Sequence, residues 1–217
     1  MKSSKEFKPA LGFDWLTGYY DLAIKLTMPE QKFRSRLVDF VDPQDKDLIL
    51  EFGFGTGKNL ILINERNSKA ELYGIDIDPK VKMIAERNLS KYFVSSSLAL
   101  YDGNNLPFED NTFDTLVSSL VFHHLNKPGK IAVLKEMYRV LKPEGKLVIG
   151  DWGKPKSKVR RLNFFMVQLI DGFTTTQDNV RGLLPSLIEQ SNFNDVHEVD
   201  YINTSIGTYC YYLASKR

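Results

Sequence analysis

Short apolar runs that end in acidic residues or glycines alternate along this chain with stretches whose apolar side chains recur every three or four positions. The runs are typical of buried strands, and the second pattern is typical of helices that pack on a sheet. The predicted strands are residues 49–52, 71–76, 98–101, 113–122 and 145–152. Residues 196–202 and 209–213 alternate as a terminal hairpin does. This order predicts an α/β protein with a mostly parallel sheet.

The first run leads into the most informative stretch, in which Glu51 is followed by Gly53, Gly55 and Gly57. Glycine reaches positive φ without Cβ strain and lets a ligand lie against the main chain. The helix predicted next, with apolar residues 60–63, has unpaired N–H groups at its start. A strand, a glycine turn and a helix in this order predict a ligand-binding turn.

The spacing of the glycines excludes two common ligands. A P-loop would need glycine where Phe52 stands and Ser or Thr where Asn59 stands. A dinucleotide fingerprint, G-x-G-x-x-G, finds Lys58 or Leu60 at its last glycine, depending on the register. The remaining pattern is an acid followed by G-x-G-x-G.

The next two strands also end in acids. Asp76 lies about 20 residues beyond the glycine turn, the separation of one strand-helix-strand unit, and its carboxylate can accept both hydroxyls of a ribose. Asp78 precedes Pro79, so we expect it to cap the next helix. The third strand leads into Asp102, Gly103 and Asn104, a composition that also suits a simple turn.

These motifs resemble the class I S-adenosylmethionine-dependent methyltransferases, of the small-molecule type related to ubiquinone and menaquinone biosynthesis. The resemblance rests on E-x-G-x-G-x-G at residues 51–57, D-x-x-x-L-P-F at 102–108, and the helix-to-strand link at 139–147, where Glu144 replaces a common glycine. It covers residues 45–217 and implies one Rossmann-like domain. The implied sheet has seven strands in the order 3-2-1-4-5-7-6, with strand 7 antiparallel and helices on both faces. Residues 1–44 are the predicted helical lead-in.

The resemblance implies S-adenosylmethionine as the cofactor, bound at the C-terminal ends of the strands. In such proteins, the aspartate at the position of Asp102 commonly hydrogen-bonds the adenine amino group. The pair Tyr20-Asp21 of the lead-in is expected to approach the methionine end of the cofactor. Alternatively, the lead-in aromatics simply cover a sheet edge. The implied cofactor-binding residues are Tyr20, Glu51, Gly53, Gly55, Gly57, Asp76, Ile77, Asp102, Gly103, Asn104 and Ser119.

Candidate catalytic residues follow the fourth and fifth strands. His123 and His124 stand where a base would be useful, since a neutral imidazole is matched to neutral pH. In the family pattern, His at this place is also frequently structural. Asp151 and Trp152 are comparably placed to hold a substrate hydroxyl or amine. No metal is expected, and the single cysteine, Cys210, excludes a cysteine-based zinc cluster and is expected to pack in a strand.

The acceptor is expected to be a small and fairly apolar molecule. Residues 162–173 form an apolar stretch after the fifth strand, ahead of a helix predicted to begin near Asn179, and could make a lid. A net charge of +2 gives no footprint for nucleic acid, although residues 154–161 are locally basic. That cluster is a solvated face, or it guides an anionic substrate or an anionic membrane surface toward the site. Peripheral contact with a membrane is the expectation if the acceptor is a lipid or quinone.

No stretch resembles a signal peptide and no run approaches 18 apolar residues, so a soluble, cytoplasmic protein is expected. A small-molecule methyltransferase acting by in-line displacement explains the motifs together. The alternatives are a methyltransferase for protein or RNA and a non-catalytic S-adenosylmethionine-binding domain. Residues 118–121 lack the N/D-P-P-[YF] motif of base methylation, which counts against nucleic acid.

Overall fold

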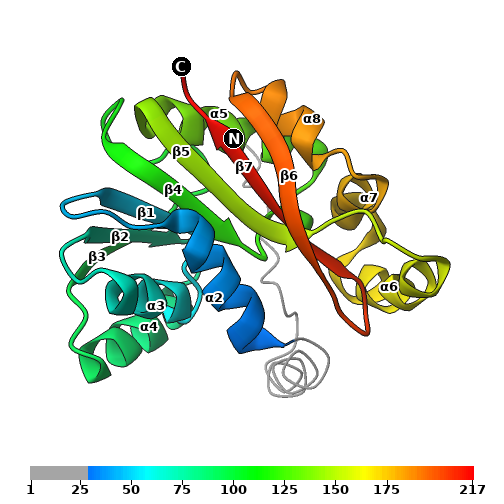
Figure 1. The fold of residues 1–217 in the computed structure, drawn as a ribbon, viewed down its shortest axis with the longest axis horizontal. Helices are drawn as coiled ribbons and strands as arrows, with labels where there is room; N and C mark the ends of the chain where they lie inside the picture. The colour runs from blue at the N-terminus through cyan, green and yellow to red at the C-terminus, as the bar shows by residue number, and fades with distance from the viewer. Residues whose placement is uncertain (1–28) are drawn as a thin grey trace, which may run out of the picture.

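The computed structural model describes residues 29–217, and a seven-stranded sheet forms its centre (Figure 1). The strands are β1 (Leu48–Phe52), β2 (Glu71–Asp76), β3 (Ser96–Leu100), β4 (Phe113–Ser119), β5 (Leu141–Trp152), β6 (Asn194–Asn203) and β7 (Thr208–Ser215). Their order is β3-β2-β1-β4-β5-β7-β6. Neighbouring strands from β3 to β5 are parallel, and β7 runs antiparallel to both β5 and β6. The predicted topology is confirmed.

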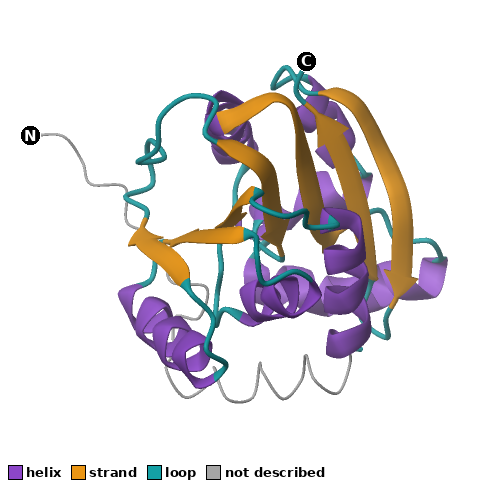
Figure 2. Cartoon of the chain, turned by 60° about the vertical axis from the view of Figure 1, so that its left-hand side comes forward, coloured by secondary structure: helices purple, strands orange, loops and turns teal. Residues whose placement is uncertain are grey.

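Helices cover both faces of this sheet (Figure 2). They are α2 (Glu30–Val41), α3 (Lys58–Arg66), α4 (Pro79–Lys91), α5 (Lys127–Val140), α6 (Lys158–Asp171), α7 (Phe173–Arg181) and α8 (Leu184–Glu189), with a short 3₁₀ helix η1 (Phe122–His124) after β4. None of these helices in residues 29–217 is both long and apolar enough to cross a membrane.

Strand alternation divides the interior into two apolar layers. Successive residues of a strand point to opposite faces, so Ile49 and Val117 pack with α2, α3 and α4, whereas Leu50 and Leu116 pack with α5 and α8. Cys210 is buried in the second layer, as expected for a packing residue. Because both faces are covered, ligands have access only at the strand ends.

The local signals between strands mostly form as predicted. The Asp78 carboxylate accepts hydrogen bonds from the N–H groups of Lys80 and Val81 and so caps α4. The prediction that a helix begins near Asn179 is wrong, because Asn179 lies near the end of α7. Gly172 and Gly182, with φ of 94° and 71°, bound α7 and separate it from α6 and α8. The apolar lid stretch is therefore the greater part of α6.

The lead-in falls only partly in the described region. Its last helix forms as α2, with Phe33 and Leu37 fully buried against the sheet. Tyr20, which was predicted to bind the cofactor, lies outside the described residues, so its role stays a prediction.

Candidate functional site

The glycine turn after β1 is open on the side where a ligand could lie. Gly53, Gly55 and Gly57 all have positive φ, of 74°, 53° and 80°. A Cβ on Gly55 would meet no atom within 4 Å, whereas a Cβ on Gly53 would come within 2.3 Å of a Val121 methyl carbon. Gly53 is therefore needed for close packing against the β4 loop, and Gly55 leaves its main chain exposed for contact.

Asp76, at the end of β2, holds this turn in place. Its Oδ2 accepts a hydrogen bond from the Gly55 N–H at 3.0 Å. Its Oδ1 accepts from the N–H groups of Ile77 at 2.7 Å and Asp78 at 3.1 Å. The predicted ribose-binding acid and the glycine turn are therefore in direct contact, although they lie 21 residues apart in the chain.

Glu51 is a buried carboxyl group with spare hydrogen-bonding capacity. Only 1% of the residue is exposed, and Oε1 accepts from Asn59 Nδ2 at 2.6 Å while Oε2 has no partner in the described part of the chain. Arg34 in turn donates to Asn59 Oδ1 at 2.8 Å. Burial, opposed by the Asn59 amide, raises the pKa of Glu51 to about 8. An ammonium group would satisfy Oε2 and favour the ionised carboxylate.

Asp102, Gly103 and Asn104 form an exposed turn after β3. Asp102 Oδ1 accepts from the Asn104 N–H at 2.9 Å, and the Tyr101 hydroxyl donates to the Asn104 carbonyl at 2.9 Å. Gly103 has φ of 87° with open space where a Cβ would stand. The segment is thus a well-formed turn, as its composition indicated, and the remaining oxygen and the Gly103 backbone remain accessible to a ligand.

Ser119, at the end of β4, is tied to a residue that sequence reasoning missed. Its Oγ lies 2.8 Å from the Tyr209 hydroxyl of β7, and both groups are buried. A Cβ on Gly150 would lie only 1.9 Å from that hydroxyl, so glycine is required where the tyrosine crosses β5. No sequence signal predicted this contact, because it depends on the strand order of the folded sheet.

His123 lies between two buried carboxylates. Its Nδ1 is 2.7 Å from Asp151 Oδ1, and its Nε2 is 3.7 Å from Asp171 Oδ2. Burial by itself lowers the pKa of His123, but the two carboxylates outweigh burial and hold the pKa above its usual value. The raised pKa favours the protonated form of His123, which cannot accept a proton.

Asp151 does not have the free carboxylate that was expected to hold a substrate. Oδ2 accepts from the N–H groups of Val121, Phe122 and His123, and Oδ1 accepts from the Trp152 N–H. With the His123 contact, these bonds occupy both oxygens. Asp151 thus fixes the loop after β4 and the His123 ring. That expectation is wrong, because the carboxylate turns back toward the chain.

His124 packs on its neighbour, with 3.9 Å between the ring centroids. Burial and the nearby His123 lower the pKa of His124 to about 3, so its imidazole is neutral and a weak base. One donor atom each from His123, His124 and Asp171 lies within 4.8 Å of the others, a grouping that could hold a metal ion. Asp171, in α6, had no sequence signal. The catalytic roles of the two histidines and the absence of a metal stay predictions.

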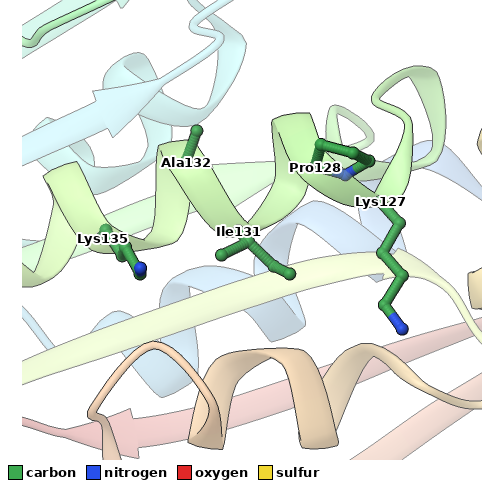
Figure 3. A pocket seen from close by; sticks show the side chains of 5 residues that line it. All are labelled: Lys127, Pro128, Ile131, Ala132 and Lys135. Atoms are coloured by element: carbon green, nitrogen blue, oxygen red, sulfur yellow. The ribbon is translucent and has the colours of Figure 1, made fainter.

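The surface also has a groove on α5, which lies apart from the strand-end residues and the two histidines. It is shallow and lined by Lys127, Pro128, Ile131, Ala132 and Lys135 (Figure 3). None of them belongs to the glycine turn, the strand-end acids or the histidine pair. The candidate site is therefore the edge formed by the ends of β1, β2, β3 and β4.

Comparisons with known proteins agree with this geometry. Residues 50–149 match the family model described as "Methyltransferase domain". A demethylmenaquinone methyltransferase of Thermotoga maritima is 30% identical over 67% of this chain, and the alignment spans less than two thirds, 62%, of that enzyme. The corresponding Geobacillus enzyme is 30% identical over 78% of this chain and 74% of its own length.

A solved structure shows the same fold. The YcgJ protein of Bacillus subtilis aligns with a TM-score of 0.67 at 12% identity, over 86% of this chain and 99% of its own. At this identity the likeness concerns the fold alone, and the Geobacillus alignment carries the family assignment. The chain belongs to the class I S-adenosylmethionine-dependent methyltransferases, in the group related to the ubiquinone and menaquinone methyltransferases.

Proposed function

We propose that this protein transfers the methyl group of S-adenosylmethionine to a small, apolar acceptor of the quinol type. The observation that carries the proposal is the glycine turn, whose main chain is open at Gly55 and is held by Asp76. Glu51, two residues before the turn, adds a buried oxygen without a partner among the described residues. These features fit a ligand that carries hydroxyl groups at one place and a cationic group at another.

Each cofactor group has a suitable partner in this arrangement. The Glu51 carboxylate suits the ammonium of the methionine part, and Asp76 with the adjacent Ile77 backbone suits the ribose. The turn at Asp102 to Asn104 suits the adenine ring. When bound, the cofactor supplies an electrophilic methyl group on sulfur. The protein's part is to align the acceptor with that group and to exclude water.

The buried charges favour an acceptor that ionises by itself. The acceptor forms a bond to the methyl carbon as the sulfur–carbon bond breaks, and the acceptor also loses a proton. The raised pKa of His123 favours its protonated form, and His124 has a pKa of about 3, so neither imidazole is suited to accept a proton at neutral pH. A quinol is more acidic than an alcohol, and its proton can pass to solvent.

Two further observations support an apolar acceptor. The relatives from Thermotoga and Geobacillus are both named for methylation of demethylmenaquinone. The last turn of α6, which ends at Asp171 beside His123, carries the exposed apolar side chains of Leu169 and Ile170. An apolar ring with a hydrocarbon tail would fit such surroundings.

The test is transfer of labelled methyl from S-adenosylmethionine to a chemically reduced, short-chain demethylated naphthoquinone. We expect label in the quinol with the native chain and none with Asp76→Ala, whereas the exposed Glu65→Gln should behave as the native chain does. Calorimetric titration with S-adenosylmethionine would show whether Asp76→Ala acts through cofactor binding. Tight cofactor binding with label only in added tRNA or protein would overturn the acceptor class, and a folded chain that binds no cofactor would overturn the whole proposal.

A further inference from the structure

Helix α6 carries a continuous apolar stripe that faces solvent. At 100° per residue, this stripe lies directly across the helix from Phe164 and Gln168, which are buried against the rest of the protein. Leu162 and Met166 are 74% and 60% exposed. The full stripe, continued by the first residue of α7, is Val159, Leu162, Phe165, Met166, Leu169, Ile170 and Phe173. Contiguous exposed apolar surface of this kind marks an interaction site.

The same segment is strongly basic. Five Lys and Arg lie within residues 154–161, and residues 154–170 contain no Asp or Glu. Since the whole chain carries a net charge of +2, the remainder carries −3. Lys154 and Lys158 are exposed and form no ion pair with any residue in the described range, whereas Lys156 pairs with Glu198. An apolar face beside a cluster of bases is the pattern of helices that lie in a membrane interface.

We propose that α6 docks this protein on an anionic lipid bilayer, with the apolar stripe among the acyl chains and the bases at the level of the phosphates. The helix begins six residues after the end of β5, and Asp171 at its end lies 3.7 Å from His123 in the candidate site. A lipid-like acceptor could therefore pass from the bilayer to the site without crossing water. This last consequence rests on the proposed function, but the docking itself does not.

The charges also argue against two other occupants of the stripe. A second copy paired through α6 would present the same segment, in which residues 154–170 contain no acid, so it would supply no negative charge to the bases. Residues 1–28 contain four Lys against three acids, so they offer no excess negative charge either. An anionic lipid surface is the occupant whose charge complements the bases.

The experiment is flotation of the full chain with vesicles of phosphatidylcholine and phosphatidylglycerol in equal parts, beside vesicles of phosphatidylcholine alone. We expect binding to the anionic vesicles that weakens strongly at about 1 M salt, where the Debye length falls to about 3 Å. The double variant Lys154→Gln with Lys158→Gln should bind about 30-fold more weakly, since each base near the surface contributes about fivefold. Lys127→Gln with Lys135→Gln on α5 makes the same change in net charge and should bind as the native chain does.

The stripe is tested by Leu162→Gln with Met166→Gln. Each substitution should weaken vesicle binding by at least about tenfold. Met83→Gln with Ile84→Gln, on the exposed surface of α4, is the matched control and should have no effect. Because both substituted pairs are exposed, circular dichroism should show native folding in each variant.

Two outcomes would overturn the docking proposal. One is equal binding of the stripe variant and the native chain to anionic vesicles. The other is a stripe that is already covered in the free protein. Peroxide oxidation without vesicles tests this, since Met166 should oxidise fast and the fully buried Met137 slowly. Protection of Met166 in a monomer would assign the stripe to residues 1–28, and protection that grows with protein concentration would assign it to a second copy.

The docking and the proposed function fail separately. Cofactor titration and turnover of a short-chain, water-soluble quinol without vesicles do not involve Leu162 or Met166, so Leu162→Gln with Met166→Gln should leave them unchanged. Vesicle binding without methyl transfer would leave α6 as a lipid-binding helix and remove only the quinol acceptor.

Discussion

At the scale of single residues, the candidate site is dominated by carboxyl groups whose behaviour is set by burial. Glu51 and Asp151 are both buried, yet their pKa values move in opposite directions. Burial dominates for Glu51, which keeps one oxygen without a partner in the described structure. Asp151 has His123 and a set of backbone N–H groups, which overcome burial and hold its pKa low. The carboxyl of Glu51 thus keeps spare hydrogen-bonding capacity, whereas that of Asp151 is part of the framework.

The raised pKa of Glu51 predicts a pH dependence of folding. The native state holds a proton on Glu51 up to about pH 8, whereas an unfolded chain releases it near 4.5. Stability should therefore be greatest below pH 4.5 as far as this group is concerned, and should fall as pH rises toward 8, by at most about 5 kcal/mol. Urea unfolding of the native chain and of Glu51→Gln across this range measures it. Parallel pH profiles for the two proteins would contradict the prediction.

Asp151→Asn should destabilise the fold by about 3 to 5 kcal/mol, because it removes the carboxylate charge that pairs with the buried His123 ring at 2.7 Å. His123 has a raised pKa, so its stabilising contribution is present below 6.5 and is lost as pH rises through the folded value. The loss of unfolding free energy caused by Asp151→Asn should therefore be smaller at alkaline pH. Asp195→Asn, which breaks the exposed pair with Arg217, is the control and should cost less than about 1 kcal/mol. Chemical unfolding measures the stability of both variants. Equal, small losses would show that the Asp151–His123 pair contributes no more than an exposed ion pair.

At the scale of elements, the two helices α6 and α7 border the candidate site without being part of the sheet. They lie beyond the end of β5 (Figure 1). Apolar packing and specific polar contacts hold them against the rest of the fold. Lys130 of α5 is one of these, since its buried ammonium donates to the Thr175 carbonyl of α7 at 2.6 Å and lies 3.4 Å from Asp178. The position of α7 over the site depends on such contacts as well as on apolar packing.

Lys130→Met should loosen α7 while the sheet keeps its structure. The substitution keeps the length of the side chain but removes the bond to Thr175, at a cost of about 1 to 3 kcal/mol. Amide hydrogen exchange in residues 173–181 should speed by about tenfold or more, with β1 and β4 unchanged. Lys135→Met, at an exposed position of the same helix, should leave hydrogen exchange unchanged both in residues 173–181 and in the sheet. Uniformly faster exchange over the whole chain would show that Lys130 supports the entire fold instead.

At the scale of the whole molecule, the fold brings the ends of four strands together, so cofactor binding should stabilise the domain as a unit. S-adenosylmethionine at 100 times its Kd would add about 2.7 kcal/mol. For a chain of this size the melting temperature should rise by about 5 to 10 °C. Gly55→Ala places a methyl group in the open space of the turn and should abolish this rise. Differential scanning calorimetry measures it, and an unchanged rise in Gly55→Ala would show that the ligand lies elsewhere.

Much of the sheet was predictable because each parallel strand is marked locally. An apolar run, a turn and an amphipathic helix report on neighbouring residues, and the family resemblance then gave the strand order. The boundary between α6 and α7 was not predicted, because the two helices are separated by Gly172 alone and the apolar pattern resumes at once with Phe173. The hydrogen bond from the Gly55 N–H to Asp76 was not predicted, and it forms because parallel strands end at one edge of the sheet.

The sequence by itself determined the fold class, the glycine turn and the acids at the strand ends, because these depend on residue type and short spacing. Only the tertiary structure decided what those groups do to one another. It buried Glu51 with an oxygen to spare, enclosed His123 between Asp151 and Asp171, and left the apolar stripe of α6 outside the core. The reason is physical: burial and charge pairing depend on residues distant in the chain, and no local pattern records which of them will meet.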